Sequence, residues 1–415
     1  MDKKFLTIIL VLISSITTCF SQKIDIYVAG GENGESVVWK NGEIIYLSDI
    51  YVNPNAVNSL YVSNGNVYVA GAKNGQAVLW KNGEVIYLTT NSIDALANSV
   101  YVSEGDVYVA GTVDSRAVVW KNGEIIYLTF GSQLAGAASA NSVFVSDGIV
   151  YVAGYEINLE RMYVAVVWVI GETTSRTYVP HDFYDTIALS VFVSDSDIYL
   201  AGFEGSGAGW NQAMLWKNNE AIYLTNGLTE SAASSVYVAG NDVYVSGFEC
   251  DADRNLVAKV WKNGENVPLA NSSINTMANS VYVVGNDLYV AITEQTPPVS
   301  TAYYLKNDEK IFLSNNGSAN SIFVVAGGTD IPQIKTDFQL KLIQRKAEIE
   351  LQPDAGSFES GWVYVYSTQG KTIYTKPVER SASIIIPTSG FPGGAYIIRL
   401  TDERTKKSWS RKVIM

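Results

Sequence analysis

The stretch Ser99-Val-Tyr-Val-Ser-Glu-Gly-Asp-Val-Tyr-Val-Ala-Gly111, followed by Ala117-Val-Val-Trp-Lys-Asn-Gly-Glu-Ile-Ile-Tyr-Leu128, decides the fold of this 415-residue chain. Apolar and polar side chains alternate along it with period two, which is typical of β-strands that bury one face. Asn-Gly and Asp-Gly dipeptides, such as Asn64-Gly65 and Asp147-Gly148 in other copies, favour the tight turns between such strands. The unit therefore predicts four short antiparallel strands, at a repeat length of about 42 residues.

Three marker residues show that the unit occurs seven times. The third-strand tryptophan recurs as Trp39, Trp80, Trp120, Trp216 and Trp261, with Trp168 and Leu305 in two degraded copies. A serine opens the first strand at Ser59, Ser99, Ser142, Ser190, Ser235, Ser280 and Ser321. A glycine ends the second strand at Gly30, Gly71, Gly111, Gly154, Gly202 and Gly247, with Ile292 in the seventh copy. Serine and glycine are 12 residues apart in each complete copy, which predicts hairpins of one register.

The two ends of the repeat region predict a closed ring. The first copy begins inside its second strand, at Asp25-Ile-Tyr-Val-Ala-Gly30, and the missing first strand appears last, at Asn320-Ser-Ile-Phe-Val-Val325. An open solenoid would instead need capping repeats. We therefore predict an all-β chain with a seven-bladed β-propeller over residues 23–328, with four strands per blade, closed by the N- and C-terminal strands.

The order of strands resembles WD-type propeller blades, although Trp-Lys stands here where those blades carry Trp-Asp. We expect the tryptophans to be core residues, each contributing roughly 2–3 kcal/mol by burial between blades. A ligand site in each blade, as in some lectin-like propellers, is the alternative interpretation. An acid or amide opens the second strand at Asp25, Asn66, Asp106, Asp197, Asp242 and Asp287. It has no second carboxylate at calcium-loop spacing, so we expect turn chemistry there and neither a metal nor a cofactor.

The N-terminus predicts export. Lys3 and Lys4 precede an apolar run at residues 5–13, and small residues follow, so residues 1–21 predict a signal peptide cleaved after Ser21 or Gln22. The run is too short to span a bilayer, which takes roughly 20 residues, and no transmembrane segment is expected after cleavage. A lipoprotein acylated at Cys19 is the alternative. Otherwise Cys250 remains as the one cysteine, and no intramolecular disulfide can form.

The C-terminal part predicts a second domain. A linker at 329–337 precedes residues 338–415, whose strand pattern predicts a small immunoglobulin-like β-sandwich. Its motifs are Val365-Tyr366, Gly370-Lys371, Phe391-Pro-Gly-Gly-Ala-Tyr-Ile397 and Arg411-Lys-Val-Ile414.

That order of motifs resembles the C-terminal sorting domain of type IX secretion cargo from Bacteroidetes. It departs at Leu351-Gln-Pro-Asp354, where the family has a Tyr-Pro-Asn-Pro-like opening. The resemblance implies recognition by type IX-like secretion machinery and a secreted or outer-membrane surface location. A plain accessory domain is the alternative.

Charge and motifs exclude several functions. Residues 1–332 carry 16 basic and 33 acidic side chains, so the body of the protein argues against nucleic acid as a partner. The single histidine, His181, lies in a loop, and no nucleophile elbow, phosphate-binding loop or zinc motif accompanies it. We expect no enzyme. The alternative is a secreted carbohydrate-active enzyme that uses two propeller-face carboxylates.

One asymmetry predicts a ligand site. Second-strand glycine and third-strand tryptophan are 9 residues apart in the first three copies and 14 in the next three, and the seventh gap is also long. Four adjacent blades should therefore raise loops on one face, where rigidly held loops bind ligands. The alternative is that these blades have accumulated loop insertions without a function, because insertions in propeller loops cost little free energy. The candidates are Tyr155, Glu160, Arg161, Tyr163, Trp210, Asn211, Asp251, Asp253, Arg254 and Glu294, with His181 and Tyr184 nearby. The expected function is a non-catalytic binding protein for a glycan or protein, with a structural surface protein as a third possibility.

Overall fold

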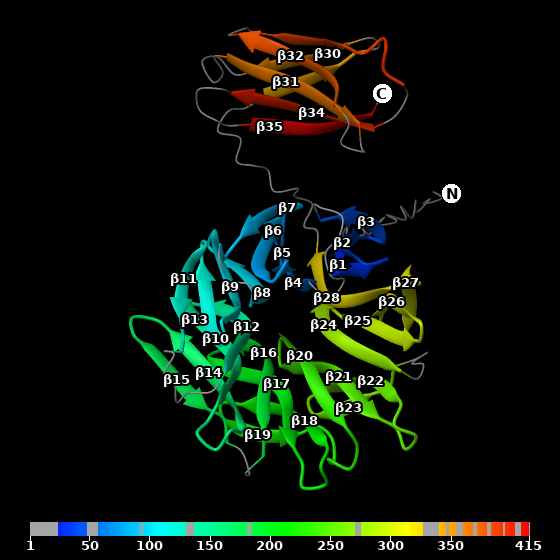
Figure 1. Cartoon of the computed structure of the whole chain (residues 1–415). Coiled ribbons are helices and arrows are strands. Elements are labelled where there is room, and N and C mark those ends of the chain that lie inside the picture. Colours follow the sequence, from blue (N-terminus) through cyan, green and yellow to red (C-terminus); the bar gives the residue numbers. More distant parts are fainter. Residues whose placement is uncertain are drawn as a thin grey trace, which may run out of the picture. The chain divides into compact units, whose positions relative to one another are not determined.

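The computed structural model describes residues 24–47, 57–90, 92, 94–129, 137–180, 184–269, 275–326, 340–345, 348–353, 360–367, 372–379, 383–392, 395–402 and 408–414. The chain divides into two compact units, Met1–Thr329 and Asp330–Met415. Every regular element among the described residues is a β-strand (Figure 1). None of those residues forms a helix long and apolar enough to cross a membrane. The predicted signal peptide and linker lie outside the described residues.

The first unit contains seven four-stranded antiparallel sheets, here called blades I to VII. Blade I is β28 (Gly317–Ala326), β1 (Ile24–Glu32), β2 (Glu35–Lys40) and β3 (Glu43–Tyr46). Blade II is β4 (Val57–Ser63), β5 (Asn66–Lys73), β6 (Gln76–Lys81) and β7 (Glu84–Tyr87). Blade III is β8 (Ala95–Ser103), β9 (Asp106–Val113), β10 (Arg116–Lys121) and β11 (Glu124–Tyr127).

The remaining four blades follow in chain order. Blade IV is β12 (Ala138–Ser146), β13 (Ile149–Ile157), β14 (Tyr163–Ile170) and β15 (Thr174–Tyr178). Blade V is β16 (Thr186–Ser194), β17 (Asp197–Gly205), β18 (Asn211–Lys217) and β19 (Glu220–Tyr223). Blade VI is β20 (Ser231–Ala239), β21 (Asp242–Cys250), β22 (Leu256–Lys262) and β23 (Glu265–Val267). Blade VII is β24 (Thr276–Val284), β25 (Asp287–Thr296), β26 (Val299–Lys306) and β27 (Glu309–Ser314).

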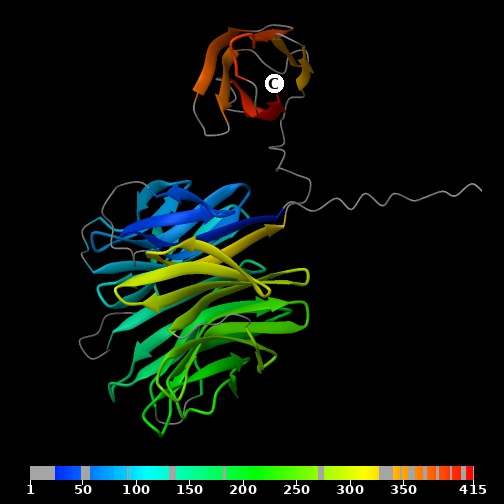
Figure 2. The same cartoon turned by 90° about the vertical axis from the view of Figure 1, so that its right-hand side faces the viewer.

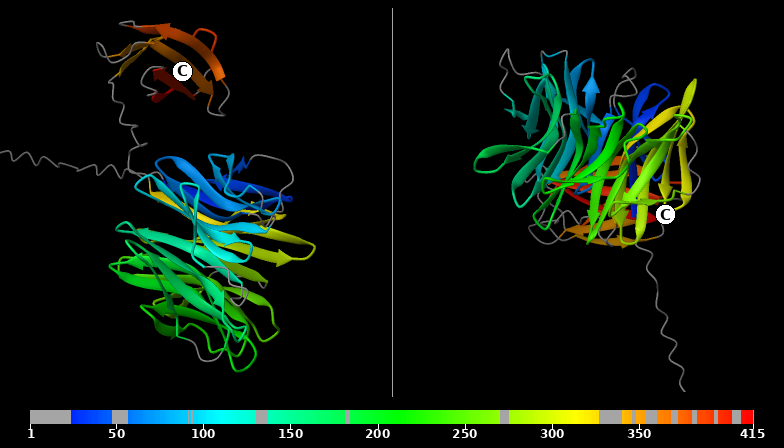
Figure 3. Two further views of the ribbon diagram at one scale, coloured as in Figure 1. Left: turned by 60° about the vertical axis from the view of Figure 1, so that its left-hand side comes forward. Right: turned by 90° about the horizontal axis from the view of Figure 1, so that it is seen from below.

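The first and last strands of this unit pair with each other, which confirms the predicted ring. Strand β1 runs antiparallel to β28, with Tyr27 opposite Phe323 and Ala29 opposite Ser321. The blue β1 lies beside the yellow β28 in Figures 1 and 2. Successive sheets pack face to face, as Figures 2 and 3 show. The unit is therefore a seven-bladed β-propeller.

Seven aromatic rings, one from the innermost strand of each blade, form a closed circle that we call the aromatic girdle. Its members are Tyr61, Tyr101, Phe144, Phe192, Tyr237, Tyr282 and Phe323. Neighbouring ring centroids are 4.6 to 5.1 Å apart and the planes are inclined by 41 to 60°. In a seven-bladed propeller, each blade is rotated by about 51° from the next around the central axis. The angles between neighbouring ring planes lie around that value.

The marker serines connect neighbouring blades. The Oγ of Ser59 accepts the backbone N–H of Val100 at 3.2 Å, and the Oγ of Ser321 accepts that of Leu60 at 3.1 Å. The same contact joins Val143 to Ser99, Val191 to Ser142, Val236 to Ser190 and Ile322 to Ser280. The serine therefore recurs because it satisfies a backbone donor of the next blade.

The tryptophans form the core between blades, as predicted. Trp39, Trp80, Trp120 and Trp216 are fully buried, and Trp168 and Trp261 are 1% and 2% exposed. Glycine recurs at the end of the second strand because the backbone of the first strand lies very close to it. A Cβ on Gly111 would lie 2.1 Å from the Leu96 carbonyl oxygen and 2.8 Å from the Trp120 ring. Any side chain there would push the strand and the tryptophan apart.

The residues after the tryptophan hold the blade together on the face opposite the long loops. In blade III the Asn122 amide donates to Asp106 at 2.8 Å and accepts the Val107 N–H at 2.9 Å, and Lys121 pairs with Asp106 at 2.9 Å. Equivalent ion pairs of 2.7 to 3.3 Å join Lys40 to Asp25, Lys217 to Asp197, Lys262 to Asp242 and Lys306 to Asp287. The opening acid thus does more than shape its own turn, and we call this contact the Asp-Lys-Asn pin.

The second unit is a two-sheet β-sandwich. One sheet contains β29 (Leu340–Gln344), β30 (Glu348–Pro353) and β33 (Ile384–Pro387). The other contains β32 (Thr372–Glu379), β31 (Ser360–Ser367), β34 (Ala395–Asp402) and β35 (Ser408–Ile414). Side chains of both sheets bury one core, which includes Leu351, Val363, Ile386 and Ile398.

Candidate functional site

The long hairpins of blades IV to VI share one face with the connections between blades, which we call the loop face. The backbone N–H of Gly205, where β17 ends, donates to the Asp185 carbonyl before β16 at 2.8 Å. In blade VI the N–H of Cys250 makes the same contact with Glu230 at 2.8 Å. In blade VII the predicted long loop is instead a longer strand pair, since Thr296 pairs with Val299.

The hairpins of blades IV, V and VI end in three turns of the same geometry, at residues 158–162, 206–210 and 251–255. In each, the first N–H donates to the fifth carbonyl, at 2.9, 2.7 and 3.0 Å respectively. The fourth N–H donates to the first carbonyl at 3.0 Å in all three. The fourth residue is left-handed in each turn: φ is 64° at Arg161, 84° at Gly209 and 66° at Arg254.

Two predicted site residues from different blades come together on this face. The Arg254 guanidinium carbon lies 5.2 Å from the centroid of the Trp210 ring, within the range of a cation–π contact. Glu230 fixes the neighbouring Asn211 from two sides, because its carboxylate accepts the Asn211 N–H at 2.9 Å and the Asn211 amide at 2.8 Å. Glu230 was not among the residues predicted from the sequence. The one feature that could have indicated it is its position directly before the first strand of blade VI.

Asp251 supports the turn that carries Arg254. Its Oδ1 accepts the N–H groups of Asp253 and Asn255, both at 2.9 Å. Hydrogen bonds from Asn255 and from the Asp253 backbone lower the pKa of Asp251. The Asp253 and Arg254 side chains are exposed, so this turn presents them and not Asp251 to a ligand.

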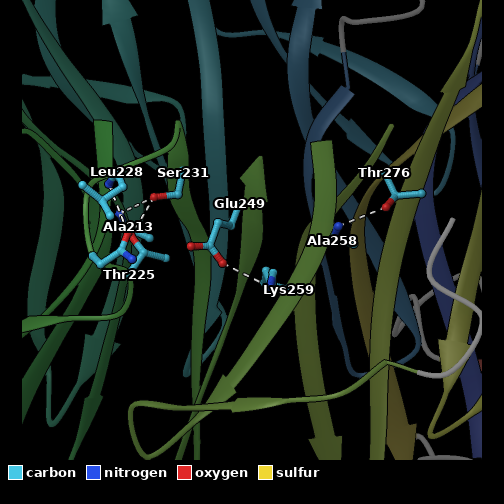
Figure 4. A network of polar contacts seen from close by, with 9 residues as sticks. Ala213, Thr225, Leu228, Ser231, Glu249, Ala258, Lys259 and Thr276 are labelled. Carbon is cyan, nitrogen blue, oxygen red and sulfur yellow. Dashed lines mark hydrogen bonds and ion pairs between the residues drawn. The ribbon is translucent and has the colours of Figure 1, made fainter. Parts of the chain in front are cut away.

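Figure 4 shows how hydroxyl groups hold the blade connections beneath these turns. Thr225 and Ser231 both accept the backbone N–H of Ala213, at 3.2 and 3.0 Å. Thr276 accepts the N–H of Ala258 at 3.0 Å, and Lys259 pairs with Glu249 at 3.1 Å. The loops of blades V and VI are thereby tied to the strands below them.

Tyr155 and Tyr163 lie together in blade IV. Their rings meet edge to face with centroids 5.1 Å apart, and burial, reinforced by the nearby Tyr163 hydroxyl, raises the pKa of Tyr155. The backbone N–H of Tyr163 donates to the Asp185 carboxylate at 2.8 Å. Both tyrosines belong to strands, not to the loop that the sequence predicted.

Blade IV also contains a hollow of about 290 Å³. It is lined by Glu156, Asn158, Val164 and Tyr178. The Tyr178 hydroxyl donates to Glu156 at 2.7 Å and Arg176 donates to the same carboxylate at 3.0 Å. The hollow is therefore polar on one wall, but its carboxylate is already partnered.

Two other predicted residues have different surroundings. Tyr184 packs on the blade V hairpin, where a Cβ on Gly207 would lie 3.1 Å from its hydroxyl. Glu294 is in blade VII and pairs with Lys310 at 3.2 Å. His181 lies outside the described residues. No cluster of three His, Cys, Asp or Glu side chains that could hold a metal occurs in the described part of the chain.

Comparison with known families identifies the C-terminal unit. Residues 344–415 match the family described as the secretion system C-terminal sorting domain. The chain therefore carries a type IX sorting domain and is an exported protein of the cell surface or the medium. Of the predicted motifs, Val365-Tyr366 lies on β31, residues 395–397 lie on β34 and residues 411–414 lie on β35, whereas Gly370-Lys371 is outside the described residues.

Comparisons of the whole chain give matches among solved structures. No curated protein matches the sequence. Among solved structures, a puromycin-hydrolyzing peptidase of Mycobacterium tuberculosis matches with a TM-score of 0.46 and 10% identity, covering 79% of this chain but only 57% of the peptidase. A nidogen/laminin complex matches with a TM-score of 0.38 and 9% identity, over 74% of this chain and 100% of that one. YjhT matches with a TM-score of 0.35 and 10% identity, over 66% and 96%.

Proposed function

We propose that this protein is a non-catalytic binding protein whose propeller presents the loop face of blades IV to VI to a glycan or protein at the cell surface. In this proposal the protein resembles WD-type and lectin-like propellers, because loops on a rigid ring of blades bind the ligand. The C-terminal domain is recognised by type IX-like secretion machinery, after residues 1–21 have directed the chain across the inner membrane as a signal peptide. Neither nucleic acid nor a cofactor takes part.

The Trp210–Arg254 contact carries the proposal. An aromatic ring and a guanidinium, brought together from two blades, combine an apolar surface with directed hydrogen-bond donors. Glu230 and Asp251 hold the backbone on both sides of the pair. Such support is what a recognition site needs to bind without reorganising.

The backbone at the arginines supports a role beyond folding. A left-handed conformation costs a non-glycine residue about 1–2 kcal/mol. Blade V has Gly209 at the position of Arg161 and Arg254, so the turn itself accepts glycine. Arg254 adopts this strained conformation and its side chain contacts Trp210, which supports a role for the side chain beyond folding.

The test is a binding screen of the full chain on glycan and protein arrays, followed by titration of Trp210→Ala and Arg254→Gly. Both variants should weaken binding at least about tenfold, which corresponds to about 1.4 kcal/mol. Arg116→Ala is the matched control: this arginine lies on the same face in blade III and pairs with Asp114 at 3.6 Å. Unchanged affinity in both site variants would remove the loop face from the proposal, and turnover on polysaccharides would make the protein an enzyme.

A further inference from the structure

The turns of blades IV and VI present the same pair of side chains. The third and fourth residues are Glu160 and Arg161 in blade IV, and Asp253 and Arg254 in blade VI. All four side chains are exposed. Because the two turns share their hydrogen bonds and their left-handed fourth residue, each acid–arginine pair starts from the same backbone geometry. The corresponding turn of blade V, between them, carries Trp210 as its fifth residue.

These two arginines differ from the others of the propeller. Arg116 pairs with Asp114 at 3.6 Å and Arg176 with Glu156 at 3.0 Å. Within the described residues, Arg161 and Arg254 make no ion pair, although an acid precedes each directly. Nor do the side chains of Glu160 and Asp253 make a hydrogen bond there. The charged groups at both turns are therefore open to a ligand.

A carboxylate and a guanidinium on successive residues of one turn offer both kinds of partner that hydroxyl groups use. The carboxylate accepts O–H donors and the guanidinium donates to hydroxyl oxygens, so each turn can hydrogen-bond a sugar. A polyanion would meet the carboxylates and the acidic propeller, and a polycation would meet the arginines. The chemistry common to both turns favours a neutral polyhydroxylated ligand.

We propose that the ligand is a neutral oligosaccharide of repeating units, which binds the acid–arginine pairs of blades IV and VI at the same time. This inference rests on the proposed function and deepens it. Two turns of the same geometry, each with an acid followed by an arginine, lie in the blades that flank the one carrying Trp210, and they match a ligand that repeats its own chemistry along its length. Binding at one pair raises the effective concentration at the other, so affinity increases by a factor of about 10² or more once the chain is long enough to span both.

The experiment is a length series. Full-length protein is titrated with β-1,4-glucan, β-1,4-xylan and α-1,4-glucan oligosaccharides of two, four and eight units, as wild type, Arg161→Gly, Arg254→Gly and the double variant. Glycine is the residue that blade V carries at this position, so the variants keep the turn. We expect at least one series to bind about 100-fold more tightly at eight units than at two. Each single variant should lose most of that gain, and Arg116→Ala should keep it.

The outcomes separate the two proposals. If Arg254→Gly and Trp210→Ala weaken binding but Arg161→Gly does not, or if affinity is independent of length, the loop face binds its ligand at a single place and the bivalent reading is wrong. If no neutral series binds while a peptide or a charged polymer does, the ligand class is wrong. If all variants bind like wild type, the proposed function fails as well.

Discussion

The ring of Phe323 lies 4.8 Å from the ring of Tyr61 between centroids, so the last strand of the propeller completes the aromatic girdle. Phe323 also lies 4.9 Å from Tyr282 on its other side. Residue 323 therefore takes part in closing the ring through its side chain as well as through the pairing of β28 with β1.

Phe323→Ala should destabilise the propeller by about 3 kcal/mol, because it removes a large, partly buried side chain and two aromatic contacts. The free energy of unfolding in urea is the measurement. Phe312→Ala is the control: that ring is 58% exposed, and its loss should cost about 0.5 kcal/mol or less. Equal effects of the two changes would mean that the girdle adds nothing to closure.

The girdle should make the protein sensitive to alkali. Burial, together with the neighbouring tyrosine hydroxyls, raises the pKa of Tyr61 and of Tyr282 well above the ordinary 10.0. Above pH 10.0 the unfolded chain then releases protons that the folded girdle retains, so stability is complete below that pH and declines above it. Tyr282→Phe should reduce this decline in thermal unfolding scans at rising pH. The exposed Tyr87→Phe should not, and an identical slope in both variants would contradict the assignment.

The Asp-Lys-Asn pins should act at the opposite end of the pH scale. Hydrogen bonds from Lys121 and Asn122 lower the pKa of Asp106 below its ordinary 3.8. The stability that this pin contributes is therefore present above pH 3.8 and is lost as the pH falls below it. Asp106→Asn should flatten the acid side of the melting-temperature profile, and blade II shows that asparagine fits, since Asn66 accepts from Asn82 at 2.8 Å. Asp308→Asn, outside the pins, should leave the acid slope as in wild type.

The left-handed arginines predict a contrast between two substitutions. Arg161→Gly should leave stability unchanged or raise it by up to about 1 kcal/mol, because glycine adopts this backbone without a Cβ clash. Arg161→Val should lower it by about 1–2 kcal/mol, because a β-branched side chain is least tolerated at φ above zero. Thermal unfolding measures both. Similar melting temperatures for glycine and valine would show that residue 161 is not left-handed in solution.

The sorting domain predicts where a shortened chain stops. A chain that ends before Gln333 lacks the matched residues 344–415 and should remain inside the cell envelope, whereas the full chain reaches the surface or the medium. Fractionation followed by immunoblotting is the measurement. Surface display of the shortened chain would show that export does not depend on this domain.

The sequence predicted the ring because strand periodicity and repeat phase are local signals. The displaced first strand at residues 320–325 was enough to place β28 beside β1. The aromatic girdle was not foreseen, since an alternating strand pattern does not say which of its side chains meet around an axis. The pairing of Asp106 with Lys121 and Asn122 was not predicted either. Each of these residues is common in turns, and the turn before β9 and the turn after β10 lie side by side only because of the register between these two strands.

The candidate site was predicted in part. Loop length predicted raised loops on blades IV to VII, and its candidates include Trp210 and Arg254, which are in contact. It misjudged blade VII, where extra residues lengthen β25 and β26, because residue spacing does not distinguish a loop from a longer hairpin. It also grouped Asp251 with the ligand-facing residues, although that carboxylate is used by its own turn.

The pairing of β1 with β28 also governs when the molecule can mature. The strand at the start of the propeller finds its partner only after residue 326 has been synthesised, so closure is a late event of high contact order. Until that final strand is present the circle is incomplete, so a chain that ends before residue 317 would leave one edge of β1 without its partner strand.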